Sequence, residues 1–188
     1  MAKVILDMSM SLDGYISGLS GQSSGLHDWF YHRNDLRNAQ IIDEMVLGTG
    51  AIVMGRRTYE LGDHMDGFVH NPFRVPHFVL THSTPERPAK GNIRFVFVTD
   101  GTHSAAAQAK EAAGGRSVII MGGAHTARQY IEAGLMDEIH IHIVPVLLGG
   151  GIRLFESNIG GDGGSYPLEV IQVVEAPGVT HVKYRVVK

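Results

Sequence analysis

The chain of 188 residues contains no cysteine, which excludes disulfides, thiol nucleophiles and zinc sites built on thiolates. Long apolar stretches are also missing, and no segment reaches the length that spans a bilayer. Near the amino terminus, Asp7 interrupts the apolar run before it could serve as the core of a signal peptide. We therefore expect a cytoplasmic protein that does not associate with membranes.

An excess of positive charge is absent too. The net charge is −3 and the isoelectric point is near 6.4, whereas nucleic-acid binding requires a basic face, so we expect no nucleic-acid partner. Hydrophobic residues make up 44% of the chain and charged residues 19%, a balance that lets the chain bury a core. From the usual length of a domain we expect residues 1–188 to form one domain.

Three familiar motifs do not occur. The P-loop pattern G-x-x-x-x-G-K-[ST] and the nucleophile elbow G-x-S-x-G are both missing. Gly48-Thr49-Gly50 precedes a predicted strand instead of following one, so it is not the glycine fingerprint of a Rossmann fold. If the chain binds a nucleotide, other residues must hold it.

Strand and helix patterns alternate along the chain. Apolar alternation predicts a first strand over 3–11, and helical spacing predicts a helix over 34–47. Further strands are predicted over 51–54, 76–81, 93–98, 118–121 and 138–148, and further helices over 104–113 and 126–133. Strands over 168–175 and 179–187, joined by Ala176-Pro177-Gly178, predict a C-terminal antiparallel hairpin. This order predicts an α/β fold with a mainly parallel sheet; the stretches 17–27 and 160–164, rich in glycine, are expected to be loops.

Two glycine-marked junctions carry the strongest functional signal. In Met54-Gly55-Arg56-Arg57-Thr58 and in Met121-Gly122-Gly123-Ala124-His125-Thr126, a short apolar run stops at glycine and polar residues begin a helix. A strand-to-helix turn presents free N–H groups and the positive end of a helix dipole, which attract anions. The alternatives are a plain helix with solvated arginines at the first junction and tight helix–strand packing at the second. Two such junctions predict a cofactor with several phosphates.

Histidine is abundant, with 11 residues, but only His140 and His142 form a close pair. In a strand their side chains share one face, where they could bind a metal ion. Two ligands do not complete a metal site, so we predict a polar strand face and no metal, with metal binding by this pair as the alternative.

Four stretches, taken together, resemble the dihydrofolate reductase superfamily, and within it the pyrimidine reductase domain of riboflavin biosynthesis. They are Ser11–Ile16, Val53–Glu60, Ile119–Gly123 and Val144–Gly151, and they occur in the expected order over nearly the whole chain. The resemblance implies a dihydrofolate reductase-like three-layer sandwich that binds NADPH. In this family a cis peptide often joins the two glycines that correspond to Gly122 and Gly123.

The resemblance also implies a role for individual residues in holding NADPH. It assigns the nicotinamide to Ser9 and Ile16, the adenosine-side phosphates to Gly55, Arg56, Arg57 and Thr58, the ribose with its 2′-phosphate to Thr81, His82 and Ser83, and the pyrophosphate to Gly122, Gly123, Ala124, His125 and Thr126.

A carboxylate is expected to supply the proton. Dihydrofolate reductases use a helix carboxylate for this purpose, and the resemblance places Asp28 at about that position of the chain. The alternative is that Asp28 caps the segment that follows it, with Trp29 in the core. Glu156 could instead reach the mouth of the site, and Arg153 or Lys90 could bind a substrate phosphate.

The resemblance implies an NADPH-dependent reductase of a small heterocyclic substrate, of the 5-amino-6-(5-phosphoribosylamino)uracil reductase type. A dihydrofolate or pterin reductase is one alternative, and a nucleotide-binding sensor without catalysis is another. The full riboflavin enzyme usually has a deaminase domain with cysteine zinc ligands, so a cysteine-free chain corresponds at most to the reductase half. Because the family often pairs through sheet edges, and the alternating segment 138–143 could supply one, we expect a homodimer.

Overall fold

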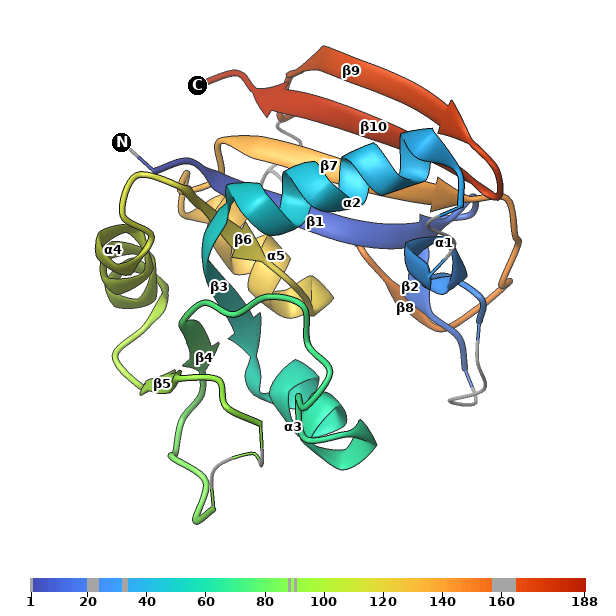
Figure 1. Ribbon diagram of the computed structural model, residues 1–188. Coiled ribbons are helices and arrows are strands. Elements are labelled where there is room, and N and C mark those ends of the chain that lie inside the picture. Colours follow the sequence, from blue (N-terminus) through green and yellow to red (C-terminus); the bar gives the residue numbers. More distant parts are fainter. Residues whose placement is uncertain (1, 20–23, 32–33, 88, 90, 157–164) are drawn as a thin grey trace.

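The computed structural model describes residues 2–19, 24–31, 34–87, 89, 91–156 and 165–188. Its main sheet (Figure 1) contains β1 (Val4–Ser11), β3 (Thr49–Gly55), β4 (His77–Leu80), β5 (Phe95–Val98), β6 (Ser117–Ile120), β7 (Glu138–Val144), β9 (Leu168–Ala176) and β10 (Val179–Val186). Their order across the sheet is β5-β4-β3-β6-β1-β7-β10-β9. The strands from β5 to β7 are parallel, and β10 and β9 are antiparallel to their neighbours. The predicted α/β class, with its mainly parallel sheet and C-terminal antiparallel hairpin, is confirmed.

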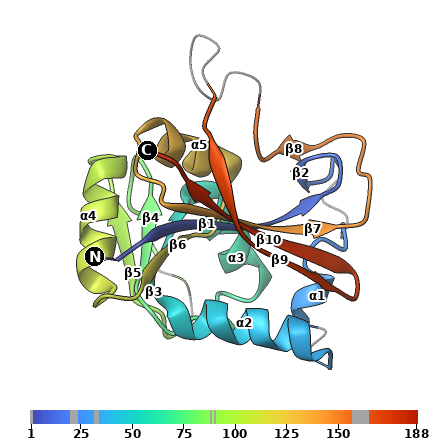
Figure 2. The ribbon, with the colours of Figure 1, turned by 90° about the horizontal axis from the view of Figure 1, so that it is seen from above.

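Helices cover both faces of the sheet, so the fold has the three layers that the resemblance implies (Figure 2). α2 (Leu36–Gly48) lies on one face, and α4 (Thr102–Ala112) and α5 (Ala124–Glu132) lie on the other. The chain passes from β1 through α2 to β3 in one direction, and through α4 and α5 to β6 and β7 in the opposite direction. Because such crossovers are right-handed, opposite directions place their helices on opposite faces.

The two faces of β1 enter different surroundings. Val4 and Leu6 pack against alanines of α4 and α5 in an entirely apolar cluster. Ile5, on the other face, belongs to a second apolar cluster, which Met45 of α2 contacts. The next residue on that face is Asp7, which is buried. The sheet is therefore apolar throughout on one side and turns polar along β1 on the other.

One helix and three short elements are missing from the predicted order. α3 (Arg56–Met65) has Tyr59 as its single buried residue, so the segment lacks the apolar periodicity that reveals a helix. Only the start of this helix was predicted, at the first junction. α1 (Asp28–Tyr31), β2 (Tyr15–Ser17) and β8 (Ile152–Arg153) have at most four residues each, too few for a recognisable period.

Two expectations about the segment after residue 138 are wrong. The strand predicted over 138–148 ends at Val144, because Pro145 has no N–H to donate to a neighbouring strand. β7 also lies between β1 and β10, so the segment 138–143 is internal and the sheet edges are β5 and β9. Parts of the expected loops, 20–23 and 160–164, lie outside the described residues. In the part of the chain that the structure describes, no helix combines the length and apolarity needed to cross a membrane.

Candidate cofactor site and active site

The two glycine junctions meet at the carboxyl edge of the sheet. β3 and β6 are parallel neighbours, so α3 and α5 both begin at this edge (Figure 1). The N–H of Gly55 donates to the carbonyl of Gly122 over 3.2 Å. A Cβ on Gly55 would lie 2.7 Å from Thr126 Oγ1, and a Cβ on Gly122 would lie 3.3 Å from Thr58 Oγ1. The hydroxyl of each helix therefore packs against the glycine of the other junction.

Both helices begin without a side-chain cap. Gly55 is the N-cap of α3 and Gly123 is the N-cap of α5, and neither end has a capping hydrogen bond from a side chain. The first N–H groups and the positive ends of two helix dipoles are thus directed to one place, which favours an anion. The Gly122–Gly123 peptide bond is cis, the form common in the family that the sequence resembles.

Arg56 connects the first junction to the end of β4. Its Nη1 donates to the carbonyl of Ser83 over 2.8 Å and to Thr81 Oγ1 over 3.4 Å. Its Nε donates to Glu60 Oε1 over 2.7 Å, which holds the guanidinium in place. The structure thus brings together three of the residues that the resemblance assigns to the adenosine end of NADPH.

The remaining predicted cofactor residues lie on the same segments. Arg57 in α3, His82 after β4 and His125 in α5 are exposed, whereas Ala124 is half-buried and Thr126 is buried. His125 Nε2 lies 3.2 Å from Gln129 Nε2, along the helix.

Beyond the junctions, one edge of β1 has no neighbouring strand; we call it the uncovered edge. β1 pairs with β7 as far as Ser11 and Val144, but its pairing with β6 ends at Leu6 and Ile120. After Ile120 the chain turns away into the second junction. The carboxyl half of β1 therefore has a strand on one side only.

The backbone of Ser9 faces this uncovered edge. In a parallel ladder, successive residues direct their N–H and C=O groups alternately to the two neighbours. Val118 N donates to Lys3 O on the β6 side, and Asp137 N donates to Val4 O on the β7 side. By this alternation Ser9 faces the β6 side, where its N–H and C=O can bind a ligand. Its side chain stands roughly perpendicular to these groups, out of the plane of the sheet. Ser9 Oγ accepts a hydrogen bond from Trp29 Nε1 over 2.9 Å.

The short strands β2 and β8 pair beside the end of β1. Ile16 of β2 is half-buried against the apolar cluster under α5. Asp13, in the turn before β2, accepts hydrogen bonds from Ser11 Oγ over 2.6 Å and from Gly149 N over 2.8 Å. The Ser11 hydroxyl contributes most to holding the pKa of Asp13 at about 2, and the amides of residues 148 and 149 add to it. Asp13 is therefore an ionised clamp on the turn.

Asp28 is the first residue of α1 and is exposed, while the next residue, Trp29, is buried. The N–H of Asp28 donates to Gly25 O over 3.2 Å. Among the described residues, no hydrogen bond is formed by its carboxylate, so the side chain does not act as a cap here. α1 lies by the carboxyl end of β1 (Figure 1), and the Trp29–Ser9 hydrogen bond ties it to that strand. α1, and with it Asp28, is thus attached to β1.

The other predicted polar residues have structural contacts. The Arg153 guanidinium lies 4.6 Å from the centroid of the Tyr15 ring. Glu156 Oε2 lies 3.7 Å from Arg128 Nη1 of α5. Lys90 lies outside the described residues.

A buried polar cluster beneath α2 was not anticipated. We call Asp7, Asn38, His140, His142 and His181 the histidine layer. His140 and His142 share one polar strand face, as predicted, and α2 covers that face. His142 Nε2 lies 2.9 Å from Asp7 Oδ1, His142 Nδ1 lies 2.7 Å from His181 Nδ1, and His181 Nε2 lies 3.0 Å from Asn38 Oδ1. In the described ranges, no group of three or more His, Asp or Glu side chains is arranged to hold a metal ion.

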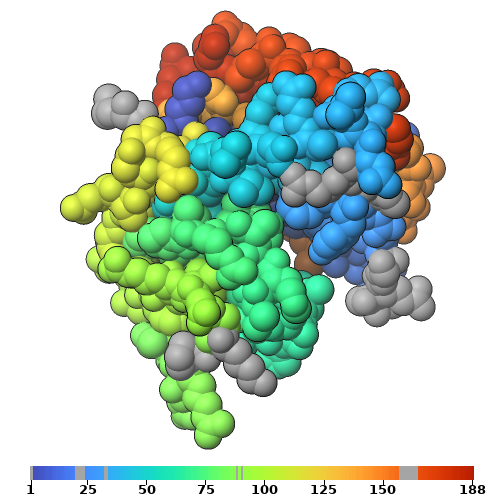
Figure 3. All heavy atoms as spheres, viewed as in Figure 1, coloured from blue at the N-terminus to red at the C-terminus, as the bar shows by residue number. Residues whose placement is uncertain are grey.

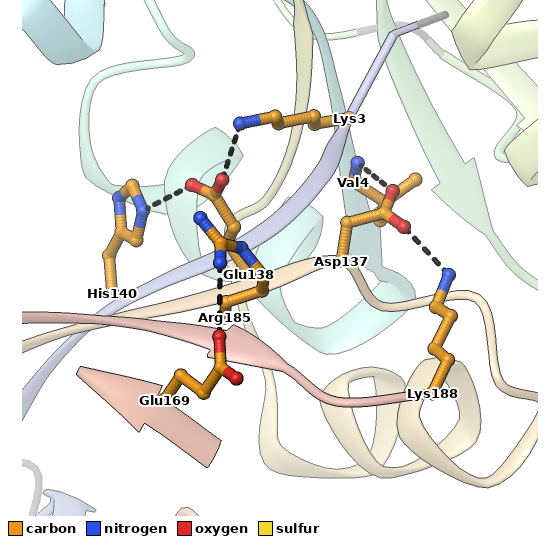
Figure 4. A network of polar contacts seen from close by, with 8 residues as sticks. All are labelled: Lys3, Val4, Asp137, Glu138, His140, Glu169, Arg185 and Lys188. Carbon is orange, nitrogen blue, oxygen red and sulfur yellow. Dashed lines mark hydrogen bonds and ion pairs between the residues drawn. The ribbon is translucent and has the colours of Figure 1, made fainter. Parts of the chain in front are cut away.

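From His140, polar contacts continue to the exposed side chain of Lys3 (Figure 4). His140 Nε2 lies 3.0 Å from Glu138 Oε2, and Lys3 Nζ donates to Glu138 Oε1 over 2.6 Å. Beside them, Asp137 accepts from Val4 N over 2.9 Å and from Lys188 Nζ over 2.7 Å. These contacts join residues from both ends of the chain. The signal in the sequence was Asp7 itself, a charge within an apolar strand that needs a buried partner.

The pattern that describes the RibD C-terminal domain family matches residues 2–159. The uncharacterized protein YyaP of Bacillus subtilis (strain 168) is 24% identical over 159 residues, which cover 81% of this chain and 80% of that protein. A Shewanella sp. PV-4 structure named for riboflavin biosynthesis is 26% identical, with a TM-score of 0.76 and full coverage of both chains.

Two more distant structures show the same fold. A Thermotoga maritima diaminohydroxyphosphoribosylaminopyrimidine deaminase/5-amino-6-(5-phosphoribosylamino)uracil reductase is 15% identical, with a TM-score of 0.74 over 99% of this chain and 57% of that one. A dihydrofolate reductase from Enterococcus faecalis complexed with NADP(H) is 18% identical, with a TM-score of 0.64 over 99% of this chain and 97% of that one. With a family match over most of its length and the dihydrofolate reductase-like fold in common, the chain belongs to the RibD C-terminal domain family.

Proposed function

We propose that this protein is an NADPH-dependent reductase of a small heterocyclic substrate, of the 5-amino-6-(5-phosphoribosylamino)uracil reductase type. The observation that carries the proposal is the meeting of two uncapped helix N-termini beside an uncovered edge of β1. The family membership supports it, as do the activities for which the Thermotoga maritima and Enterococcus faecalis proteins are named.

The residues present fit a dinucleotide with several phosphates. The N-termini of α3 and α5 offer backbone donors to the pyrophosphate, and Gly55 and Gly122 let the backbone approach it closely. Arg56, held by Ser83 and Glu60, offers its remaining donors to a 2′-phosphate, which an arginine recognises through paired hydrogen bonds. This arrangement favours NADPH over NADH.

At the other end of the cofactor, the backbone of Ser9 supplies an N–H and a C=O to the carboxamide of the nicotinamide. Ile16, beside β1, packs on the ring. When bound, the cofactor supplies the hydride. The protein orients the ring against the substrate and excludes water from the reacting atoms.

Asp28 is the proposed proton donor. Its carboxylate forms no hydrogen bond within the described chain, and the Trp29–Ser9 hydrogen bond attaches α1 to β1. We infer that this carboxylate reaches a ring nitrogen of a substrate placed over the nicotinamide. A positioned carboxylic acid transfers a proton to a substrate atom within hydrogen-bond reach.

The first test is a fluorescence titration with NADPH and then with NADH. We expect NADPH to bind more tightly than NADH, and Gly55→Asp to abolish the binding of both. Arg56→Ala should weaken the binding of NADPH about tenfold and leave the binding of NADH almost unchanged, as the loss of one charged contact predicts. Arg128→Ala is the matched control, because Arg128 forms the same i,i+4 ion pair with Glu132, at 2.7 Å, away from the first turn of α5. Failure of both nucleotides to bind would refute the proposal.

Turnover then separates the alternatives. Oxidation of NADPH with the ribosylaminopyrimidine supports the pyrimidine reductase, and oxidation with dihydrofolate supports a pterin reductase instead. Binding without turnover on either substrate would favour a nucleotide sensor on the same fold.

We also propose that the protein forms a homodimer. The edge strand β9 exposes the apolar side chains of Val170 and Val173, and burial of such an edge against a second copy would remove them from water. Elution at the size of a monomer in gel filtration would refute the dimer.

A further inference from the structure

The hydrogen bonds of the histidine layer define how many protons it holds. Asp7 Oδ1 is an acceptor, so His142 Nε2 carries a proton and donates to it over 2.9 Å. Asn38 Nδ2 donates to Pro177 O, which turns the amide oxygen of Asn38 toward His181. His181 Nε2 therefore also carries a proton and donates it to Asn38. The opposite amide orientation would bring two oxygens, those of Asn38 and Pro177, together.

The contact between the two imidazole rings then requires a third proton. His142 Nδ1 and His181 Nδ1 are 2.7 Å apart. Two bare lone pairs repel at this distance, so one proton must lie between the nitrogens. Three protons on two imidazoles give one positive charge. Asp7 attracts that charge to His142, which is 3% exposed.

The ionisation of the neighbours agrees with this count. Burial and the charge of His142 lower the pKa of His181 to about 4, so His181 is the neutral member of the pair. Burial alone would raise the pKa of Asp7, but the charge of His142 and hydrogen bonds from His140 and His142 outweigh it and keep the pKa below its ordinary value.

The other charged groups around His142 come from four elements. His140 precedes it on β7, Lys183 lies on β10, and Glu44 lies on α2; these three side chains and His142 line a cavity of about 80 Å³ beneath α2. Lys183 is paired with Glu44 at 2.9 Å, which compensates its charge. Burial lowers the pKa of His27, which precedes α1, and the charge of His142 lowers it further. Asp7 is therefore the carboxylate in direct contact with the His142 ring.

Trp29 packs directly on the two imidazoles. Its ring centroid lies 4.4 Å from that of His142 and 4.9 Å from that of His181. A cation against an indole ring is attracted to it, most strongly away from water. The same indole donates to Ser9 Oγ on β1, and the residue before it is Asp28.

We propose that His142 and His181 share one proton as a buried cation, and that this cation holds Trp29, and with it Asp28, beside the edge of β1. His142 is then a positioning residue. The cation and the position of Trp29 are independent of the proposed reductase function, whereas the effect on catalysis rests on it.

The proton count is measured directly by long-range ¹H–¹⁵N correlation spectra of the imidazole nitrogens at pH 7. We expect His142, assigned by its loss in His142→Gln, to show two protonated nitrogens. His77 is the internal control: it is fully buried, and its Nδ1 lies 2.8 Å from Val75 O, so it should show a single neutral tautomer. A neutral His142 with one bare nitrogen would overturn the proposal, and this spectrum needs no cofactor.

The position of Trp29 is measured by its fluorescence, because it is the single tryptophan of the chain. A protonated imidazole in contact with indole quenches its emission. We expect emission to rise in His142→Gln and to stay unchanged in His103→Gln, which changes an exposed histidine of α4. Should His142→Gln fail to fold, the double variant Asp7→Asn with His142→Gln removes both charges and keeps a hydrogen-bonded pair. Unchanged emission in the folded variant would refute the contact.

The catalytic consequence is a fall in kcat, up to about a hundredfold, with little change in the KM for NADPH, as misplacement of a reacting group predicts. Unchanged kcat would refute the positioning role. If wild-type protein binds no NADPH, the reductase proposal fails, while the spectra still decide the shared proton.

Discussion

The glycine junctions and the histidine layer lie in neighbouring parts of the same sheet, but they are built in opposite ways. The junctions work through backbone groups, and their glycines remove side chains so that N–H donors stay accessible. The histidine layer works through side chains that satisfy one another away from water. One region is left open for a ligand, and the other is closed. Added side-chain bulk at the junctions should therefore weaken ligand binding, and removal of a charge from the histidine layer should lower the unfolding free energy.

Removal of the Asp7 charge should have the largest effect. Asp7→Asn leaves the cation of the layer without its partner, and an uncompensated buried charge costs about 3–5 kcal/mol of unfolding free energy. Urea denaturation measures this loss. The double variant Asp7→Asn with His142→Gln should recover most of it, and a loss below about 1 kcal/mol in the single variant would contradict the buried ion pair.

The second-largest effect should come from added bulk at the second junction. Gly122 has φ +91° and lies close to Thr58, so Gly122→Ala should cost about 1–2 kcal/mol through its backbone alone and weaken NADPH at least about tenfold. Gly134→Ala is the matched control, since Gly134 also has positive φ, +64°, but its Cβ would meet open space at the far end of α5. The two variants should lose similar stability, and only Gly122→Ala should lose affinity. Equal affinities in titration would argue against a phosphate site at this junction.

Acid should destabilise the protein through its buried neutral histidines. Burial lowers the pKa of His77 and of His181 to about 4, the charge of His142 adding to the effect at His181. Between about pH 6.5 and pH 4 the unfolded chain binds protons that the folded chain does not. Stability is therefore lost as pH falls through this range, by up to about 1.4 kcal/mol per pH unit for each histidine.

Urea denaturation at several pH values checks this slope. His77→Gln should remove about half of it, because His181 remains. A slope unchanged by His77→Gln would show that His77 already titrates normally.

The smallest effect should come from an exposed ion pair at the surface of the same sheet. Glu169 and Arg185 are 3.0 Å apart (Figure 4), with side chains 59% and 60% exposed. Glu169→Ala should change the unfolding free energy by less than about 0.5 kcal/mol, because water screens exposed pairs. A loss as large as that of Asp7→Asn would mean that burial is not what distinguishes the layer.

The parts of the fold with strong local signals could be predicted. Apolar runs such as 118–121 and the turn at Pro177-Gly178 identified strands and the C-terminal hairpin from neighbouring residues alone. Beyond its start, α3 was not predicted, because a single buried residue shows no helical periodicity. The strand predicted past Val144 did not take into account that Pro145 lacks a backbone N–H.

The candidate cofactor site was largely accessible from sequence, because each junction is a continuous stretch of chain. The resemblance assigned Arg56, Thr81 and Ser83 to the adenosine end of the cofactor, and the structure shows Arg56 hydrogen-bonded to both others. The partners of Asp7 could not be found in this way. They lie about 135 residues away, and no local pattern says which of 11 histidines a buried carboxylate will meet.

By itself, the sequence determined the α/β class and the two glycine junctions, because propensity, periodicity and turn chemistry act over a few residues. The family followed from the resemblance of four short stretches, each continuous in the chain. The tertiary structure alone decided which edge of β1 is uncovered, which strands form the sheet edges, and how His142, His181 and Trp29 meet. Those features depend on the order of strands across the sheet, and that order is set by the packing of helices on its two faces.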